Sequence, residues 1–214
     1  EPRSGPGTPR GAAALLRERV KTGVTRTGSI PTEDVVISPG RLREELRGVD
    51  DPSTIIELSF AFPKQWTLAP GPNIDVRDLR TSDSAFVLAA PLPKGKELTD
   101  LPSSYFFDVL FSPEGKYGQY GAVDDRRVVS SQLVSGPGGT PGRQLDITFS
   151  ALSFNYNLVE RRLLLRATAL EGGVYMLVAS TFATRFAKTQ DQMLDTLNSF
   201  DAHVVRASRS AATA

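Results

Sequence analysis

Residues 161–181 read RRLLLRATALEGGVYMLVAST, two apolar runs separated by Glu171-Gly172-Gly173. A short connection that contains glycine, where a positive φ is needed, is typical of the turn in a β-hairpin. The runs at 161–170 and 174–181 therefore predict two neighbouring antiparallel strands. This hairpin is the best-defined part of the sequence, and the other predicted elements are placed around it.

Two further strands are predicted directly before the hairpin, at 127–134 and 144–152. The segment 135–142, SGPGGTPG, lies between them and is typical of a turn. Earlier in the chain, apolar runs and alternating patterns predict strands at 55–62, 74–79 and 85–90.

Apolar residues at helical spacing predict helices at 102–111 and 189–200. The order is therefore strands, a helix, an antiparallel meander and a closing helix. This order favours an α+β fold, an antiparallel β-sheet flanked by helices, over a parallel βαβ sheet.

The N-terminal part has a different composition. Positions 1–30 hold six basic residues against Glu1 and Glu18, a local charge of +4, and the first eleven residues are rich in proline and glycine. Short helices are expected at 12–21 and at 39–47, the second capped by Ser38 and ended by Gly48. We therefore divide the chain into an irregular extension (1–53), a domain (54–205) and a tail (206–214). Because the extension has little apolar surface, we expect a partner to order it.

Composition excludes several classes of function. The 25 basic and 24 acidic residues give a net charge of +1, which argues against nucleic-acid binding. The chain has no cysteine and one histidine, His203, so it cannot build thiolate sites, disulfides or a metal site with two histidines. No apolar run approaches the roughly 20 residues of a membrane span. The chain begins Glu1-Pro2, so we expect any targeting peptide to have been removed already.

Three polar motifs have ordinary structural interpretations. Gly136-Pro137-Gly138-Gly139 lacks the lysine and the following helix of a phosphate loop, so we interpret it as a hairpin turn. Asp124-Asp125 is a weak calcium motif, since Ca²⁺ needs six to eight oxygens and no other acidic residue lies nearby in sequence. No nucleophile motif is present. We therefore expect no catalytic residue, no cofactor and no metal.

Basic and aromatic side chains outside the predicted core are candidates for an interface. Basic side chains could pair with acidic loops of a partner, and tyrosine is enriched at protein interfaces. The candidates are Arg17, Arg19, Lys21, Arg26, Arg41, Arg43, Tyr117 and Tyr120.

Five segments, in the same order, resemble the PsbP family of thylakoid lumen proteins. Residues 58–66, LSFAFPKQW, resemble its Phe-x-x-Pro-x-x-Trp opening. The other four are 85–91 (AFVLAAP), 98–101 (LTDL), 172–180 (GGVYMLVAS) and 194–200 (LDTLNSF). The resemblance covers about residues 54–205, and it implies a sheet between helical layers, a PsbP-like α/β/α sandwich.

The resemblance also implies a function. The expectation is a non-catalytic extrinsic subunit that docks on the lumenal face of photosystem I or II, peripheral to the thylakoid membrane of a chloroplast. Its partners would be transmembrane and extrinsic photosystem subunits, with light-harvesting antenna proteins as further contacts. The alternatives are a transient photosystem assembly factor of the same fold and a small ligand-binding protein.

Overall fold

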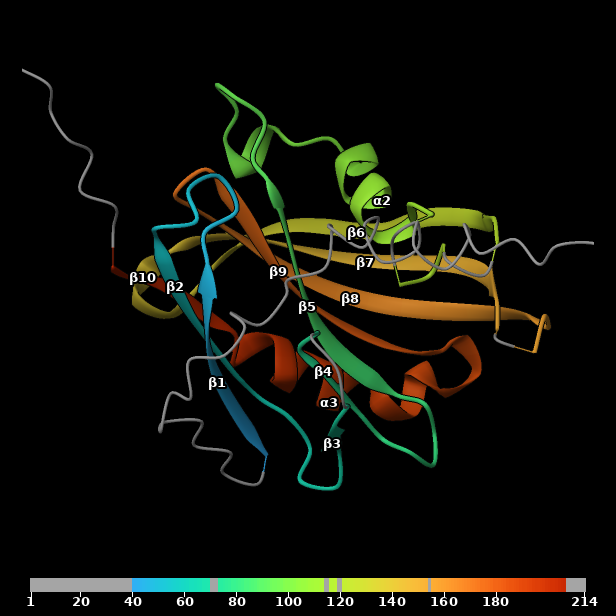
Figure 1. The fold of residues 1–214 in the computed structure, drawn as a ribbon. Helices are drawn as coiled ribbons and strands as arrows, with labels where there is room; N and C mark the ends of the chain where they lie inside the picture. Colours follow the sequence, from blue (N-terminus) through green and yellow to red (C-terminus); the bar gives the residue numbers. More distant parts are fainter. Residues whose placement is uncertain (1–39, 70–72, 114–115, 119–120, 154, 207–214) are drawn as a thin grey trace, which may run out of the picture.

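The computed structural model describes residues 40–69, 73–113, 116–118, 121–153 and 155–206 (Figure 1). These residues form two antiparallel sheets and two α-helices, which confirms the predicted α+β class. The sequence led us to expect one sheet, whereas the structure has a seven-stranded and a three-stranded sheet.

The seven-stranded sheet has the order β3-β4-β5-β9-β8-β7-β6. Its longest strands are the predicted meander, and neighbouring strands in that meander are joined by short turns. The strands are β3 (Thr67–Leu68), β4 (Asp75–Arg77), β5 (Ser84–Pro91), β6 (Val123–Ser135), β7 (Pro141–Leu152), β8 (Leu158–Leu170) and β9 (Gly173–Phe182).

The hairpin between β8 and β9 turns at Glu171 and Gly172, as the sequence predicts. Leu170 pairs with Gly173, and the two residues between them both have positive φ, +45° and +72°. This is the backbone of a tight turn whose twist matches the strands. A side chain at Gly172 would also meet Asp50, since an added Cβ would lie 2.9 Å from the Asp50 Cβ.

One face of the large sheet is covered by α2 (Ser103–Phe111), which follows the short 3₁₀ turn η1 (Leu98–Asp100). Phe106, Leu110 and Phe111 are buried, and they pack on Leu145 and Leu165 of the sheet. The spacing of these apolar residues is what predicted the helix.

The opposite face is covered by α3 (Phe186–Asn198) and by the small sheet. α3 begins after a short 3₁₀ turn, η3 (Ala183–Arg185), and buries Met193 and Leu197 against Leu177 of β9. A third short 3₁₀ turn, η2 (Pro137–Gly139), occupies the predicted turn between β6 and β7.

The small sheet consists of β1 (Arg41–Arg47), β2 (Ile55–Ala61) and β10 (Asp201–Arg206), in the order β1-β2-β10. The helix predicted for 39–47 was therefore wrong, because these residues form a strand that pairs with β2 over its whole length. Leu42 and Leu46 are each 1% exposed and belong to the core. Residues 40–53 thus join the folded domain, and the predicted helix at 12–21 lies outside the described residues.

Candidate docking surface

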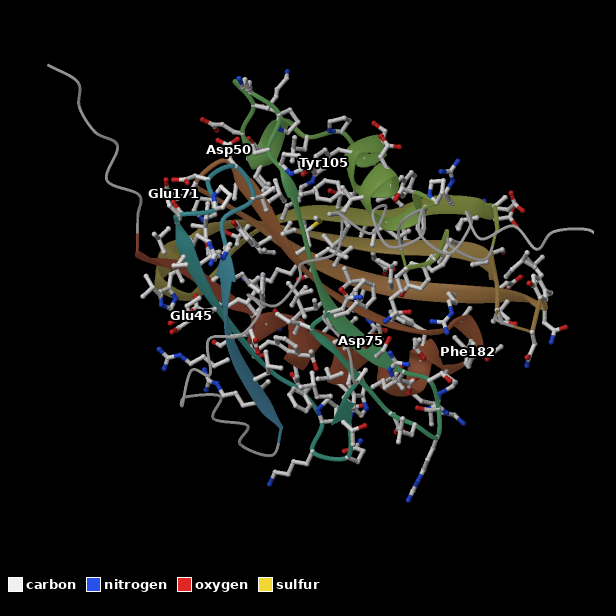
Figure 2. All side chains as sticks on the ribbon, in the orientation of Figure 1. Glu45, Asp50, Asp75, Tyr105, Glu171 and Phe182 are labelled. Atoms are coloured by element: carbon white, nitrogen blue, oxygen red, sulfur yellow. The ribbon has the colours of Figure 1, made fainter. Side chains whose placement is uncertain are left out.

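The strand β1 presents a row of charged side chains to solvent. Because side chains alternate along a strand, burying Leu42 and Leu46 exposes Arg41, Arg43 and Arg47 together with Glu45. Arg41 and Arg47 lie about 20 Å apart at the two ends of this row. Figure 2 labels Glu45, which marks this side of the small sheet.

Glu57 of β2 is the centre of a charge network on this face. Nη2 of Arg43 donates to its Oε2 at 2.5 Å, and Nε2 of His203 lies 3.3 Å from its Oε1. Glu45 is directly opposite Glu57 in the strand register, a like-charge pair that is unfavourable by itself. Arg43 offsets that repulsion, so its side chain is partly committed to the fold.

Arg41 and Arg47 differ from Arg43, because neither has an ion pair among the described residues. Their guanidinium groups can therefore meet an acidic partner without first breaking an ion pair to another described residue. Arg47 was not among the sequence candidates. The apolar residues of RLREELR, Leu42 and Leu46, are four positions apart, which fits one face of a helix as well as one face of a strand, so the local pattern did not identify the strand or this residue.

Tyr117 is not an interface residue in this structure. It is 6% exposed, and its ring centre lies 4.7 Å from that of Phe149 and 5.9 Å from that of Phe86. Burial raises the pKa of its hydroxyl, with the nearby charge of Arg161 opposing the rise. The prediction of an exposed contact at Tyr117 was wrong, because the ring completes the aromatic core under α2.

The other five sequence candidates cannot be placed. They lie outside the described residues, so their role stays a prediction. They are Arg17, Arg19, Lys21, Arg26 and Tyr120.

Next to Tyr117, a buried acid joins two basic side chains. Oδ2 of Asp75 accepts hydrogen bonds from Nη2 of Arg77 at 2.7 Å and from Nζ of Lys116 at 2.9 Å. The Lys116 nitrogen also lies 4.0 Å from the ring centre of Phe86. Burial lowers the pKa of Lys116, and the charge of Asp75 opposes this effect. No local pattern in the sequence indicates this cluster, because its members come from β4 and from the loop after α2.

A small hollow among the described residues lies elsewhere in the fold. It is lined by the turn between β6 and β7, by the start of β10 and by Arg166 of β8. Its volume of about 10 Å³ holds about one water molecule. Arg166 donates to Asn198 Oδ1 at 3.1 Å and to the Ser135 carbonyl oxygen at 2.6 Å. These bonds tie α3 to the end of β6, a structural role.

Two further classes of site can be checked across the part of the chain that is described. No group of three or more His, Asp or Glu side chains there is placed to hold a metal ion. Asp125, part of the weak calcium motif, accepts a hydrogen bond from Ser150 at 3.2 Å instead. None of the described helices is both long and apolar enough to cross a membrane.

Comparison with solved structures identifies the architecture. The solution structure of cyanobacterial PsbP (CyanoP) from Synechocystis sp. PCC 6803 is similar to this chain with a TM-score of 0.52. The similarity covers 83% of this chain and 99% of that one at 18% sequence identity. The fold is PsbP-like. The expectation drawn from the five sequence segments is confirmed at the level of the fold.

Other comparisons add nothing to this conclusion. A Pseudomonas aeruginosa protein of unknown function, PA94, described as a putative regulator, matches with a TM-score of 0.32 at 12% identity. That similarity covers 72% of this chain and 95% of that one, and it is too weak to support an argument. No protein-family model matches the chain, and no curated protein matches it.

Proposed function

We propose that this protein is a non-catalytic extrinsic subunit that docks on the lumenal face of a photosystem in the thylakoid. The PsbP-like fold, which matches nearly the whole of CyanoP, is the observation that carries the proposal. The polar groups of the described residues add support, since Asp75, Glu57 and Arg166 are each engaged with other residues of the fold.

The docking surface in this proposal is the exposed row on β1, with Arg41 and Arg47 facing acidic loops of the photosystem. Arginine is well suited to this role because its planar guanidinium can bind a carboxylate with two hydrogen bonds. The basic residues at 17, 19, 21 and 26 precede this strand in the sequence and would pair with further acidic loops of the photosystem. Such charges mainly set the approach and register of the partner, with modest affinity from each.

The test is co-purification from thylakoids. Tagged full-length chain is expressed in a photosynthetic host, and photosystem I and photosystem II particles are separated on a density gradient. We expect the chain to migrate with one photosystem and to leave it in about 1 M salt, where the Debye length falls to about 3 Å. A chain that is absent from both particles would refute docking.

Stoichiometry in the same preparation distinguishes a subunit from an assembly factor. A subunit is present at about one copy per mature complex. A chain found only with incomplete particles would instead support the assembly role. A subunit and an assembly factor would have the same fold, so the two roles are distinguished by whether the chain is found in mature or in incomplete particles.

A further inference from the structure

The two sheets expose four strand edges among the described residues, and three of them are protected. An unprotected edge offers a row of free N–H and C=O groups to another strand, so proteins shorten such edges, break them or place charges on them. β3 has two residues, β1 carries five charged side chains, and β10 begins at Asp201 and has a bulge after Val204.

The fourth edge, β6, has little protection. Its first half has charged residues at 124–127 and two bulges. From Ser130 to Ser135 it then pairs with β7 in unbroken register, with no charge and no proline. No described strand lies on its other side, as Figure 1 shows for the end of the large sheet. Leu133 in this segment is 64% exposed.

We propose that the edge segment Ser130–Ser135 pairs with the same segment of a second copy of this chain. Because the segment is uncharged, two copies of it can pair antiparallel without electrostatic repulsion. A single two-fold contact also covers the free edge of both molecules at once. The charges on β1 and on the first half of β6 restrict pairing to this segment. The result is a two-fold dimer in which the two large sheets become continuous.

A two-fold axis at Gln132 is one register that keeps the paired residues within the uncharged segment. With this axis, Ser131 of one copy is opposite Leu133 of the other, and Ser130 is opposite Val134. Members of each pair lie on the same face of the sheet, as an antiparallel register requires. Leu133, which pairs with Arg143 of β7 on its other side, is then flanked by strands on both sides.

The expected dimer is weak. With this axis the contact involves five residues of each copy, and it buries much less surface than the roughly 1,200 Å² buried in stable protein interfaces. The monomer should therefore dominate in dilute solution and the dimer at high concentration. Backbone hydrogen bonds and apolar contact would hold it, so added salt should not dissociate it.

Sedimentation velocity of the full chain tests the proposal over about 10 µM to 1 mM, a range that covers weak affinities. The wild-type mass should rise with concentration from that of one chain toward that of two. Leu133→Lys should weaken association at least tenfold, because it places a charge at the seam. Leu158→Lys is the matched control, since Leu158 is 63% exposed and does not lie on this edge. Circular dichroism confirms that both variants are folded.

Four outcomes would overturn the proposal. The wild type could remain a monomer at every concentration, or Leu133→Lys could associate as well as the wild type does. Both lysine variants could lose association equally, or the mass could exceed that of two chains, which the single unprotected edge among the described strands does not explain. If the isolated wild type stays monomeric and Leu133→Lys lowers retention on photosystem particles, the edge serves a different protein and not a second copy.

Discussion

Nη2 of Arg185 donates a hydrogen bond to Oδ2 of Asp83 at 2.9 Å, which ties the start of α3 to the loop between β4 and β5. Asp83 is 3% exposed, and it also accepts hydrogen bonds from Thr181 at 2.6 Å and Thr81 at 2.8 Å. One carboxylate thus holds together a helix start, a strand and a loop.

Asp83→Asn is expected to destabilise the domain by about 2 kcal/mol, because the substitution removes the charge that these donors face. Arg185 is partly exposed to solvent, so the expected loss of stability lies at the lower end of the range for a buried ion pair. Urea unfolding measures the change. Asp124→Asn, at an exposed position on β6, is the control, and an equal loss in both variants would contradict the assigned role.

The same carboxylate gives a pH dependence. Burial alone would raise the pKa of Asp83, but the hydrogen bonds from Arg185, Thr181 and Thr81 and the charge of Arg185 lower it below the usual 3.8. The folded state therefore binds fewer protons than the unfolded state in this range, and stability falls as the pH falls below about 4. Unfolding of the wild type and Asp83→Asn between about pH 2 and 7 checks this, and the two curves should converge at the acid end.

Three tyrosines should resist ionisation while the protein is folded. Burial raises the pKa of Tyr105 to about 12, and it also raises the pKa of Tyr117 and Tyr175. Since the folded pKa exceeds the unfolded one, this contribution to stability is complete below about pH 10 and is lost as the pH rises further. Absorbance of ionised phenol near pH 11 should be much lower for folded than for urea-unfolded chain. Equal absorbance would show that the rings are accessible.

The role of β1 in the domain can be tested by truncation. A chain that begins at residue 40 retains β1 and should unfold cooperatively near the wild-type temperature. A chain that begins at residue 51 loses Leu42 and Leu46 from the core, at about 2–5 kcal/mol for each such loss, and should not fold stably. Thermal unfolding compares the two. A stable chain from residue 51 would restore the original boundary at residue 53.

Charge reversal tests the docking row. Arg41→Glu with Arg47→Glu should lower retention on the photosystem by about tenfold at moderate salt, because two attractive contacts become repulsive. Lys94→Glu with Lys96→Glu changes the charge equally on an exposed loop that is not part of β1 and should have little effect. Equal losses in both double variants would indicate dependence on net charge and would contradict a specific surface.

The sequence predicted the meander and both α-helices because local pattern and tertiary role agree there. Each of these signals is local and spans about ten residues or fewer. They are the Gly172 turn, the apolar runs on each side of it, and the spacing of Met193 and Leu197. A strand at 55–62 was equally clear. These elements also carry the PsbP resemblance, so the fold could be predicted from short segments.

The failures have a physical cause too. Residues 41–47 contain good helix formers, and a propensity argument favours a helix, but pairing with β2 and burial of Leu46 outweigh propensity. Tyr117 lies in a polar loop, and nothing in the adjacent sequence shows that Phe149 and Phe86 enclose it. The contact of Lys116 with Asp75 joins residues 41 positions apart, beyond the reach of any local pattern.

The position of β2 between β1 and β10 affects how the protein can be made. Its two neighbours are the first and last strands of the described chain, so their pairing with β2 spans both short and very long sequence separations. During synthesis the ribosome releases the N-terminal strands first, and β2 can pair with β1 while the C-terminal strand is still inside the exit tunnel. The small sheet can close only after residue 206 emerges, so one edge of β2 stays open to wrong pairing while the whole large sheet and α3 are being synthesised.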